Sequence, residues 1–353
     1  MADKVLMKGN EALAEAAIQA GCHHFFGYPI TPQTELAAYM AKRMPKIGGT
    51  YLQAESEIAA INMVLGASAA GVRAMTSSSS PGISLKGEGI SYMAGSDLPA
   101  LIINVQRGGP GLGGIQPSQA DYWQATKALG HGDFQVLVFA PSTVQEMVDL
   151  VQGAFDMADK YRMPAMILAD GMLGQMMEPV VLPEKSEKEP IAKPWASCGH
   201  KGEREHNIVN SLYLTPNALE NLVKERYERY ETIKKNEQMA EEYLTEDAEL
   251  ILVAYGASSR VAKGAVNKAR EKGLKVGLIR PITLWPFPTD AIKRAASHAK
   301  ALLTVEMSMG QMVDDVKLAC EQKLPVHFYG RTGGIIPAPA DILNKIKEMG
   351  GNK

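Results

Sequence analysis

Short apolar runs alternate with amphipathic stretches over the first half of the chain. Six runs have the length of buried strands, at 23–28, 50–53, 72–77, 101–106, 135–139 and 165–169. The stretches 10–20, 33–42, 82–94 and 144–160 carry apolar residues at helical spacing. Strands that alternate with helices of this length predict a parallel sheet covered on both faces. Ligands bind beyond the carboxyl ends of such strands, so we expect the site in the loops that follow them.

The composition changes in the middle of the chain. Pro183–Pro190 is a charged, proline-bounded linker, and Pro216–Tyr243 is expected to be one long charged helix. A second alternation follows, with strands expected at 249–254, 275–279, 301–306 and 326–329 and helices at 260–272, 289–297 and 311–322. We therefore expect three parts, 1–180, 181–247 and 248–353, and assign packing and assembly to the last, in which we find no catalytic constellation.

Composition narrows the class of protein. The chain has 353 residues and a formal charge of −2, so it carries no basic surplus for nucleic acid. No apolar run approaches the roughly 20 residues that span a bilayer, and the amino terminus is typical of an amphipathic helix rather than a signal peptide, so we expect no membrane contact and a cytoplasmic location. The cysteines Cys22, Cys198 and Cys320 are too few and too scattered for an iron–sulfur cluster or structural zinc held by this chain alone, and we predict no metal site.

The stretch 53–82 contains an acidic helix start, a helix rich in small residues, a strand and a turn. Glu55 and Glu57 lie at the helix start, where the macrodipole favours negative charge. Alternatively, Glu57 sits at the rim of an apolar face, is desolvated, and shares a proton with a ligand nitrogen. Ser77–Ser80 and Pro81 then offer hydroxyl and N–H groups, although ordinary helix capping also explains serines before a helix.

Two further loops follow predicted strands. In the first, Pro29 and Pro32 stiffen the chain around Thr31, which either presents its hydroxyl or merely belongs to a rigid connection. The second, 107–114, contains a literal GxGxxG from Gly109 to Gly114, but a proline interrupts it and no helix or acidic strand end follows as a dinucleotide site requires. We expect these glycines to bring the backbone close to a ligand, and Arg107 either to meet an anion or to form a surface ion pair.

These four segments together resemble the α subunit of thiamine-diphosphate-dependent 2-oxoacid:ferredoxin oxidoreductases, over nearly the whole chain. The runs QAESEIAAINMVLGAS, SSSSPGISLKGEGISY and RGGPGLGGIQPSQADY look most like the branched-chain 2-oxoisovalerate (3-methyl-2-oxobutanoate) type. The resemblance implies a pyrimidine-type doubly wound parallel-sheet domain that binds thiamine diphosphate, followed by a smaller domain like the carboxyl-terminal domain of transketolase.

The resemblance also implies roles for individual residues. Glu57 matches the glutamate that hydrogen-bonds the aminopyrimidine and promotes formation of the carbon nucleophile. Thr31 and Arg107 match the groups that hold the substrate carboxylate and keto oxygen. The implied cofactor-binding residues are Glu57, Tyr28, Pro29, Ile30, Ser79 and Ser80.

The chain lacks the Gly-Asp-Gly of a magnesium–diphosphate site, and its nearest string, His131–Phe134, ends in a bulky residue. The resemblance therefore implies a β subunit that carries the diphosphate and Mg, a γ subunit, and a ferredoxin-like subunit with 4Fe-4S clusters, with ferredoxin, coenzyme A and a 2-oxoacid as reactants. Two alternatives stay open. A 2-oxoglutarate enzyme would need a second cation, for which Lys86 is a candidate although solvation of Lys86 is the simpler expectation; a non-catalytic nucleotide-binding module would use Gly109–Gly114.

Overall fold

A seven-stranded sheet organises the first part of the chain. The structure is a computed structural model and describes residues 4–183 and 191–349. The strand order is β12-β6-β7-β5-β4-β2-β3, and all neighbours are parallel except β12 and β6. Its strands are β2 (His24–Gly27), β3 (Thr50–Gln53), β4 (Ala74–Ser78), β5 (Leu101–Gln106), β6 (Leu137–Phe139), β7 (Ala165–Asp170) and β12 (Thr283–Trp285). The central strands β4, β5 and β7 are buried along their whole length, because helices cover both faces of the sheet.

Two groups of helices cover the sheet. The helix α1 packs against α2 and α5, whereas α3 packs against α4. Right-handed crossovers between the parallel strands require these two groups to lie on opposite faces. The bounds are α1 (Gly9–Gln19), α2 (Thr34–Arg43), α3 (Glu57–Ala69), α4 (Ser80–Gly95) and α5 (Val144–Tyr161). The expected doubly wound α/β architecture is confirmed.

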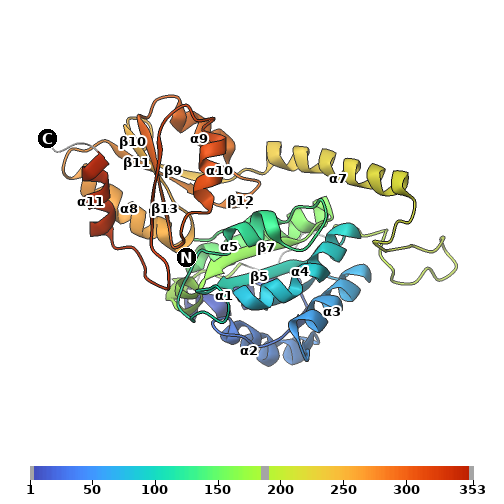
Figure 1. Cartoon of the computed structure of the whole chain (residues 1–353). Coiled ribbons are helices and arrows are strands. Elements are labelled where there is room, and N and C mark those ends of the chain that lie inside the picture. Colours follow the sequence, from blue (N-terminus) through green and yellow to red (C-terminus); the bar gives the residue numbers. More distant parts are fainter. Residues whose placement is uncertain (1–3, 184–190, 350–353) are drawn as a thin grey trace.

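A second, five-stranded sheet has the order β14-β13-β10-β11-β9, in which only β9 is antiparallel to its neighbour. Figure 1 shows this domain, in orange and red, beside the first one. Its strands are β9 (Ala240–Tyr243), β10 (Leu250–Val253), β11 (Val276–Pro281), β13 (Ala301–Glu306) and β14 (Val326–Gly330). Its helices are α8 (Gly256–Arg270), α9 (Thr289–Ala296), α10 (Met312–Ala319) and α11 (Pro339–Met349).

The prediction of one helix from Pro216 to Tyr243 is wrong at its carboxyl end. The helix α7 spans Pro216–Asn236, and the chain then enters β9, which pairs with the edge strand β11. Helix propensity over these last residues is outweighed by tertiary pairing. The linker Pro183–Pro190 lies largely outside the described residues. Elements that the pattern did not predict are β1 (Val5–Lys8), β8 (Met177–Val180), α6 (Gly171–Gln175), a 3-10 turn (Met44–Ile47), a π turn (Gln124–Ala128), β12 and α11.

Gln119, which is fully buried, connects the two domains. Its side chain donates to the carbonyl oxygen of Tyr255 at 2.8 Å and accepts from the backbone N–H of Met307 at 3.0 Å and from the hydroxyl of Ser258. Its backbone N–H also donates to the carbonyl oxygen of Met307, at 2.9 Å. One amide thus fixes α8 and the end of β13 against the first domain.

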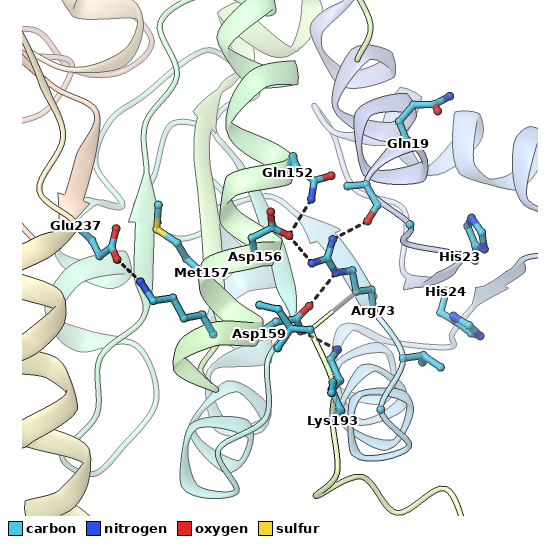
Figure 2. A pocket seen from close by; sticks show the side chains of 17 residues that line it. Gln19, His23, His24, Arg73, Gln152, Asp156, Met157, Asp159, Lys193 and Glu237 are labelled. Carbon is cyan, nitrogen blue, oxygen red and sulfur yellow. Dashed lines mark hydrogen bonds and ion pairs between the residues drawn. The ribbon is translucent and has the colours of Figure 1, made fainter. Parts of the chain in front are cut away.

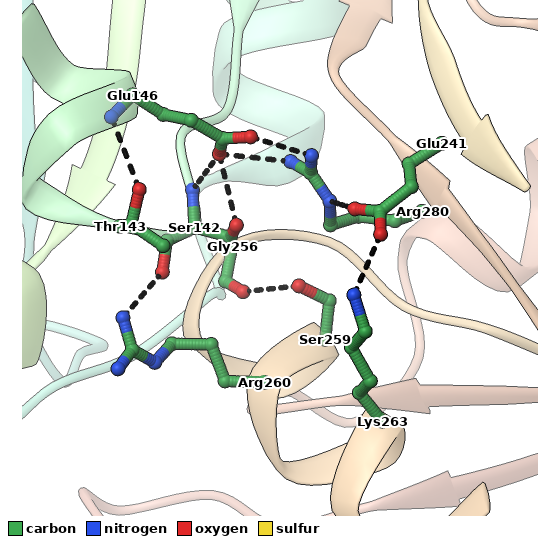
Figure 3. Close-up of polar contacts among 9 residues, drawn as sticks. All are labelled: Ser142, Thr143, Glu146, Glu241, Gly256, Ser259, Arg260, Lys263 and Arg280. Atoms are coloured by element: carbon green, nitrogen blue, oxygen red, sulfur yellow. Dashed lines mark hydrogen bonds and ion pairs between the residues drawn. The ribbon is translucent and has the colours of Figure 1, made fainter. Parts of the chain in front are cut away.

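A second joint is formed by charged side chains (Figure 3). The guanidinium of Arg280 binds Glu146 of α5 with two nitrogens, at 2.6 and 3.0 Å, and Glu241 of β9 with its Nε, at 2.8 Å. Glu241 in turn accepts from Lys263, at 2.8 Å. Arg280 is only 5% exposed, whereas the side chains of Glu146 and Glu241 are 27 and 34% exposed, so this network has a buried guanidinium with partly exposed carboxylates and links the two domains. In the described ranges, no helix is long and apolar enough to cross a membrane.

Candidate functional site

Four loops lie at one edge of the seven-stranded sheet. They follow β2, β3, β4 and β5, whose carboxyl ends point the same way because these strands are parallel and adjacent in the sheet. The loops hold the residues singled out from the sequence, at 28–31, 55–57, 79–80 and 107. This edge is where a doubly wound sheet binds its ligands.

Glu57 is the first residue of α3 and is 7% exposed. The hydroxyl of Ser56 caps the helix by accepting from the backbone N–H of Ala59, at 3.2 Å. The Glu57 side chain lies against the start of α4, because a methyl group on Gly82 would come within 2.7 Å of its Oε1. Within the described ranges no hydrogen bond engages this carboxyl group, whereas the neighbouring Glu55 is exposed. Glu57 therefore stands at a helix start and is buried, and its sharing of a proton with a ligand nitrogen stays a prediction.

The serines at the carboxyl end of β4 and directly after it divide into hydroxyls with and without a hydrogen-bond partner. Those of Ser78 and Ser79 are buried without a hydrogen-bond partner in the described part of the chain. By contrast, Ser77 donates to Gln33 at 2.6 Å, and Ser80 donates to Asp121 at 2.5 Å. A buried hydroxyl with no partner is costly, so the hydroxyls of Ser78 and Ser79 are available for a ligand, while that of Ser80 is already used within the protein.

Asp121 is a member of the site that sequence reasoning missed. It accepts from Ser80 and, at 2.9 Å, from the amide of Asn104. Burial raises the pKa of this carboxyl, and the two hydrogen bonds act in the opposite direction. Ser80 also accepts from the backbone N–H of Arg107 at 3.0 Å, so Asp121 positions the first residue of the glycine-rich loop through Ser80. Asp121 belongs to one of the runs that carried the resemblance, which was the only signal for it.

Arg107 connects two of the loops. Its Nη1 donates to the carbonyl oxygen of Thr31 at 2.9 Å and its Nη2 to that of Leu112 at 3.3 Å, while its Nε is buried with no partner in the described residues. It is 8% exposed, so it is not a surface ion pair. The Thr31 side chain is exposed, and Tyr28 and Ile30 are half-buried. The structure thus brings Thr31 and Arg107 together through the Thr31 backbone.

The glycine-rich loop folds back on itself. The N–H of Gly108 donates to Gln116 at 3.0 Å, that of Gly114 donates to Gly108 at 2.9 Å, and an antiparallel bridge pairs Arg107 with Pro117. Gly113 has a φ of +55°, and a methyl group there would overlap the carbonyl oxygen of Gly108. No helix opens at Gly114, so this loop lacks the strand–turn–helix geometry of a dinucleotide site.

The expectation that Lys86 is solvated is wrong. Lys86 lies on α4 and is fully buried, and its Nζ donates to the backbone carbonyl oxygen of Glu57 at 3.3 Å. Burial lowers the pKa of Lys86 to about 8, against an opposing attraction to Glu57.

A large cavity lies at the opposite edge of the sheet, by the amino ends of β2 and β4, and has a volume of about 1080 Å³. Figure 2 shows that its charged groups bind one another: Arg73 binds Asp156 and Asp159 at 2.5 and 2.9 Å, and Lys193 binds Asp159 at 2.7 Å. Because these charges are already neutralised, the cavity offers little to a ligand, and the candidate site remains at the carboxyl edge.

The carboxyl-edge site combines a desolvated carboxyl, free buried hydroxyls and a guanidinium with an unused nitrogen. Such groups fit a polar heterocycle and an organic acid. Within the described ranges no cluster of His, Cys, Asp or Glu could hold a metal ion.

Two family models match the chain. Residues 15–242 match "Pyruvate flavodoxin/ferredoxin oxidoreductase, thiamine diP-bdg", and residues 248–342 match "Pyruvate:ferredoxin oxidoreductase core domain II". The ketoisovalerate oxidoreductase subunit VorB of Methanothermobacter marburgensis is 50% identical over 346 residues, which cover 98% of each chain. The 2-oxoglutarate synthase subunit KorA of Methanocaldococcus jannaschii is 39% identical, over 95% of this chain and 97% of that one.

A solved structure is also similar. The 2-oxoglutarate:ferredoxin oxidoreductase from Magnetococcus marinus, with 2-oxoglutarate, coenzyme A and succinyl-CoA bound, aligns with a TM-score of 0.89 and 28% identity. The alignment covers 98% of this chain and 65% of that chain.

Proposed function

The chain belongs to the 2-oxoacid:ferredoxin oxidoreductase family, and on that basis we propose that it supplies the pyrimidine-binding half of a thiamine diphosphate site in an enzyme that oxidises a branched-chain 2-oxoacid to its acyl-CoA. The observation that carries the proposal is the Glu57 carboxyl group, buried and free of hydrogen bonds in the described structure, at the start of α3. Ser79 offers a buried hydroxyl at the same edge.

The residues present fit the cofactor. When bound, thiamine diphosphate supplies a carbon nucleophile that adds to the keto carbon of a 2-oxoacid and accepts the electron pair left by loss of CO₂. Glu57 would hold a proton between its carboxyl oxygen and a ring nitrogen of the cofactor. The loop from Tyr28 to Ile30 and the hydroxyl of Ser79 would hold the ring, while Ser80 acts indirectly, by fixing the backbone of Arg107.

Arg107 and Thr31 hold the acid. The free Nε of Arg107 can donate to a substrate carboxylate, because its Nη atoms are anchored on Thr31 and Leu112 and fix the plane of the guanidinium. A 2-oxoglutarate enzyme needs a further cation for the second carboxylate. Lys86 does not fill this role because it is fully buried and bonded to Glu57, and this observation favours a branched-chain acid.

The other half of the site comes from partner subunits. The chain has no Gly-Asp-Gly for magnesium and the diphosphate, and three cysteines cannot supply the four thiolates of a 4Fe-4S cluster. Apolar side chains stand exposed around the site, on β3, at the start of α3 and on the glycine-rich loop: Leu52, Ile58 and Leu112 are 40, 49 and 85% exposed. We assign this rim as the contact surface for a β subunit that carries the diphosphate and Mg. An iron–sulfur subunit takes up the electrons and reduces ferredoxin. A γ subunit completes the assembly, which is cytoplasmic.

The test is coenzyme-A-dependent viologen reduction by the chain coexpressed with its neighbouring subunits. The substrates are 2-oxoisovalerate, 2-oxoglutarate, pyruvate and an arylpyruvate, and the variants are Glu57→Gln and, as the matched control, Glu55→Gln. We expect 2-oxoisovalerate to give the highest kcat/KM. We also expect Glu57→Gln to lose most turnover while assembling normally, because it removes the shared proton without changing volume, and Glu55→Gln to keep it.

Preference for 2-oxoglutarate would change the assigned substrate from the branched-chain acid to 2-oxoglutarate, and a cation other than Lys86 would have to bind the second carboxylate. Full turnover in Glu57→Gln would refute the role of Glu57. No reduction with any acid would overturn the proposed function.

A further inference from the structure

Lys86 occupies an unfavourable place for a cation. It is fully buried on α4, and its ammonium group points at the first turn of α3, where the helix macrodipole is positive. Among the described residues its ammonium group has one acceptor, a backbone carbonyl, and such a buried charge costs free energy that a methionine of similar volume would not. Such a residue calls for a functional explanation.

The two helices approach closely at this place because Gly82 has no side chain. The Glu57 carboxyl therefore rests against the start of α4, one turn before Lys86. Glu57 offers Lys86 its backbone carbonyl oxygen, 3.3 Å from Nζ, and its negative charge. Lys86 thus contacts Glu57 from the interior of the protein, whereas the proposed cofactor would approach Glu57 from the other side.

Other charged groups near α4 are engaged elsewhere. Asp121 is bonded to Ser80 and Asn104, Glu88 accepts from Tyr92 at the surface, and His131 pairs with Ser91. The guanidinium of Arg107 is directed to two backbone carbonyls. Glu57 is consequently the charged partner that acts on Lys86.

We propose that Lys86 is a positioning residue for proton sharing at Glu57: its buried ammonium anchors the first turn of α3 and stabilises the Glu57 carboxylate, which shifts the shared proton toward the ligand nitrogen. The inference rests on the proposed function and adds a residue to it. Lys86 touches neither cofactor nor substrate and acts only through Glu57.

The proposal predicts a discrimination between two ligands. One is thiamine diphosphate, and the other is its pyridyl analogue, which has carbon in place of the ring nitrogen that faces Glu57. If Lys86 acts through the shared proton, its removal weakens binding of thiamine diphosphate but hardly affects the analogue. If it merely holds the helix in place, both ligands lose affinity equally.

The experiment measures the affinity of both ligands for the coexpressed assembly by calorimetry, for the native chain and for Lys86→Met and Lys86→Arg. We expect Lys86→Met to melt no lower than the native assembly, because it removes a buried charge, and to reduce the preference for thiamine diphosphate over the analogue by about tenfold, the factor that corresponds to 1.4 kcal/mol. Lys86→Arg keeps the charge and should retain most of the preference.

A pH series supplies a second readout. Since the pKa of Lys86 is lowered to about 8, the ammonium is present at pH 7 and lost at higher pH. The preference for thiamine diphosphate in the native assembly should fall as pH rises through about 8, persist to higher pH in Lys86→Arg, and stay low at every pH in Lys86→Met.

If Lys86→Met lowers the affinity for both ligands equally, or lowers neither, the role of Lys86 is overturned and the proposed function is left intact. Failure of the native assembly to bind thiamine diphosphate at all would overturn the proposed function, and this inference with it.

Discussion

Adding one methyl group at Gly82 tests the geometry of the site. An ideal Cβ on Gly82 would lie 2.7 Å from Oε1 and 3.1 Å from Cγ of Glu57, and would overlap the hydroxyl of Ser78. Ordinary contact begins at about 3.4 Å, so in Gly82→Ala the carboxyl must retreat by roughly 0.7 Å or α4 must move away from α3.

The expected change in stability of Gly82→Ala follows from two opposing effects. Alanine in a helix is favoured over glycine by about 1 kcal/mol, whereas overpacking of a close contact costs about 1–3 kcal/mol. We expect Gly82→Ala to lower the free energy of unfolding by about 1 kcal/mol. A misplacement on the order of 1 Å near reacting groups costs up to about a hundredfold in rate, so we expect a fall in kcat of about tenfold or more.

The matched control is Gly153→Ala in α5, where a methyl group meets no atom within 4 Å. It should raise the free energy of unfolding by about 0.5–1 kcal/mol through helix propensity and leave kcat unchanged. Both variants are compared by thermal unfolding and by viologen reduction in the assembled enzyme. If Gly82→Ala equals Gly153→Ala in both assays, Glu57 is not held by this contact and the reasoning about the site is refuted.

Three further predictions concern the domain joint, a buried carboxyl and the anion-binding group. Arg280→Met should destabilise the chain by about 2 kcal/mol in urea unfolding, because it removes a buried guanidinium that binds both Glu146 and Glu241, whereas Arg294→Met at a surface pair should cost less than about 1 kcal/mol. Burial raises the pKa of Asp170 to about 6, so the folded state binds a proton more tightly than the unfolded state, and this group's contribution to stability is greatest at low pH and is lost as pH rises through about 6. Urea unfolding should therefore show that, as the pH rises from 4 to 8, the free energy of unfolding of the native chain falls by up to about 3 kcal/mol relative to that of Asp170→Asn. Arg107→Lys should raise KM for the 2-oxoacid by about tenfold or more, measured by viologen reduction, because an ammonium group cannot hold both loop carbonyls and still present a fixed donor.

Each of these has an outcome that contradicts it. Equal stability losses for the two arginine variants would mean that the burial of Arg280 does not strengthen the joint between the domains. Parallel stability curves for the native chain and Asp170→Asn would mean that the carboxyl keeps its ordinary acidity, and an unchanged KM in Arg107→Lys would remove the guanidinium from substrate binding.

The pattern of apolar residues determined the architecture of the first domain. The bounds of β3 and β5 were predicted to the residue, and those of the other parallel strands to within two residues or so. Burial on both faces of a parallel sheet imposes a continuous apolar run on each strand, and this signal is local in sequence. Because carboxyl ends of parallel strands meet at one edge, the sequence also indicated that the loops after these strands lie at the same edge of the sheet.

Tertiary structure alone decided the electrostatics of the site and the joint between domains. Lys86 donates to the backbone carbonyl oxygen of Glu57, 29 residues away, and Ser80 donates to Asp121, 41 residues away. The strand β12, far along the chain, completes the first sheet by pairing with β6. A side chain's burial and its partner depend on which distant segment packs against it, whereas hydrophobic periodicity reports only that some segment does. The sequence therefore supplied candidate residues for the site, and the fold determined which of their side chains are engaged within the protein.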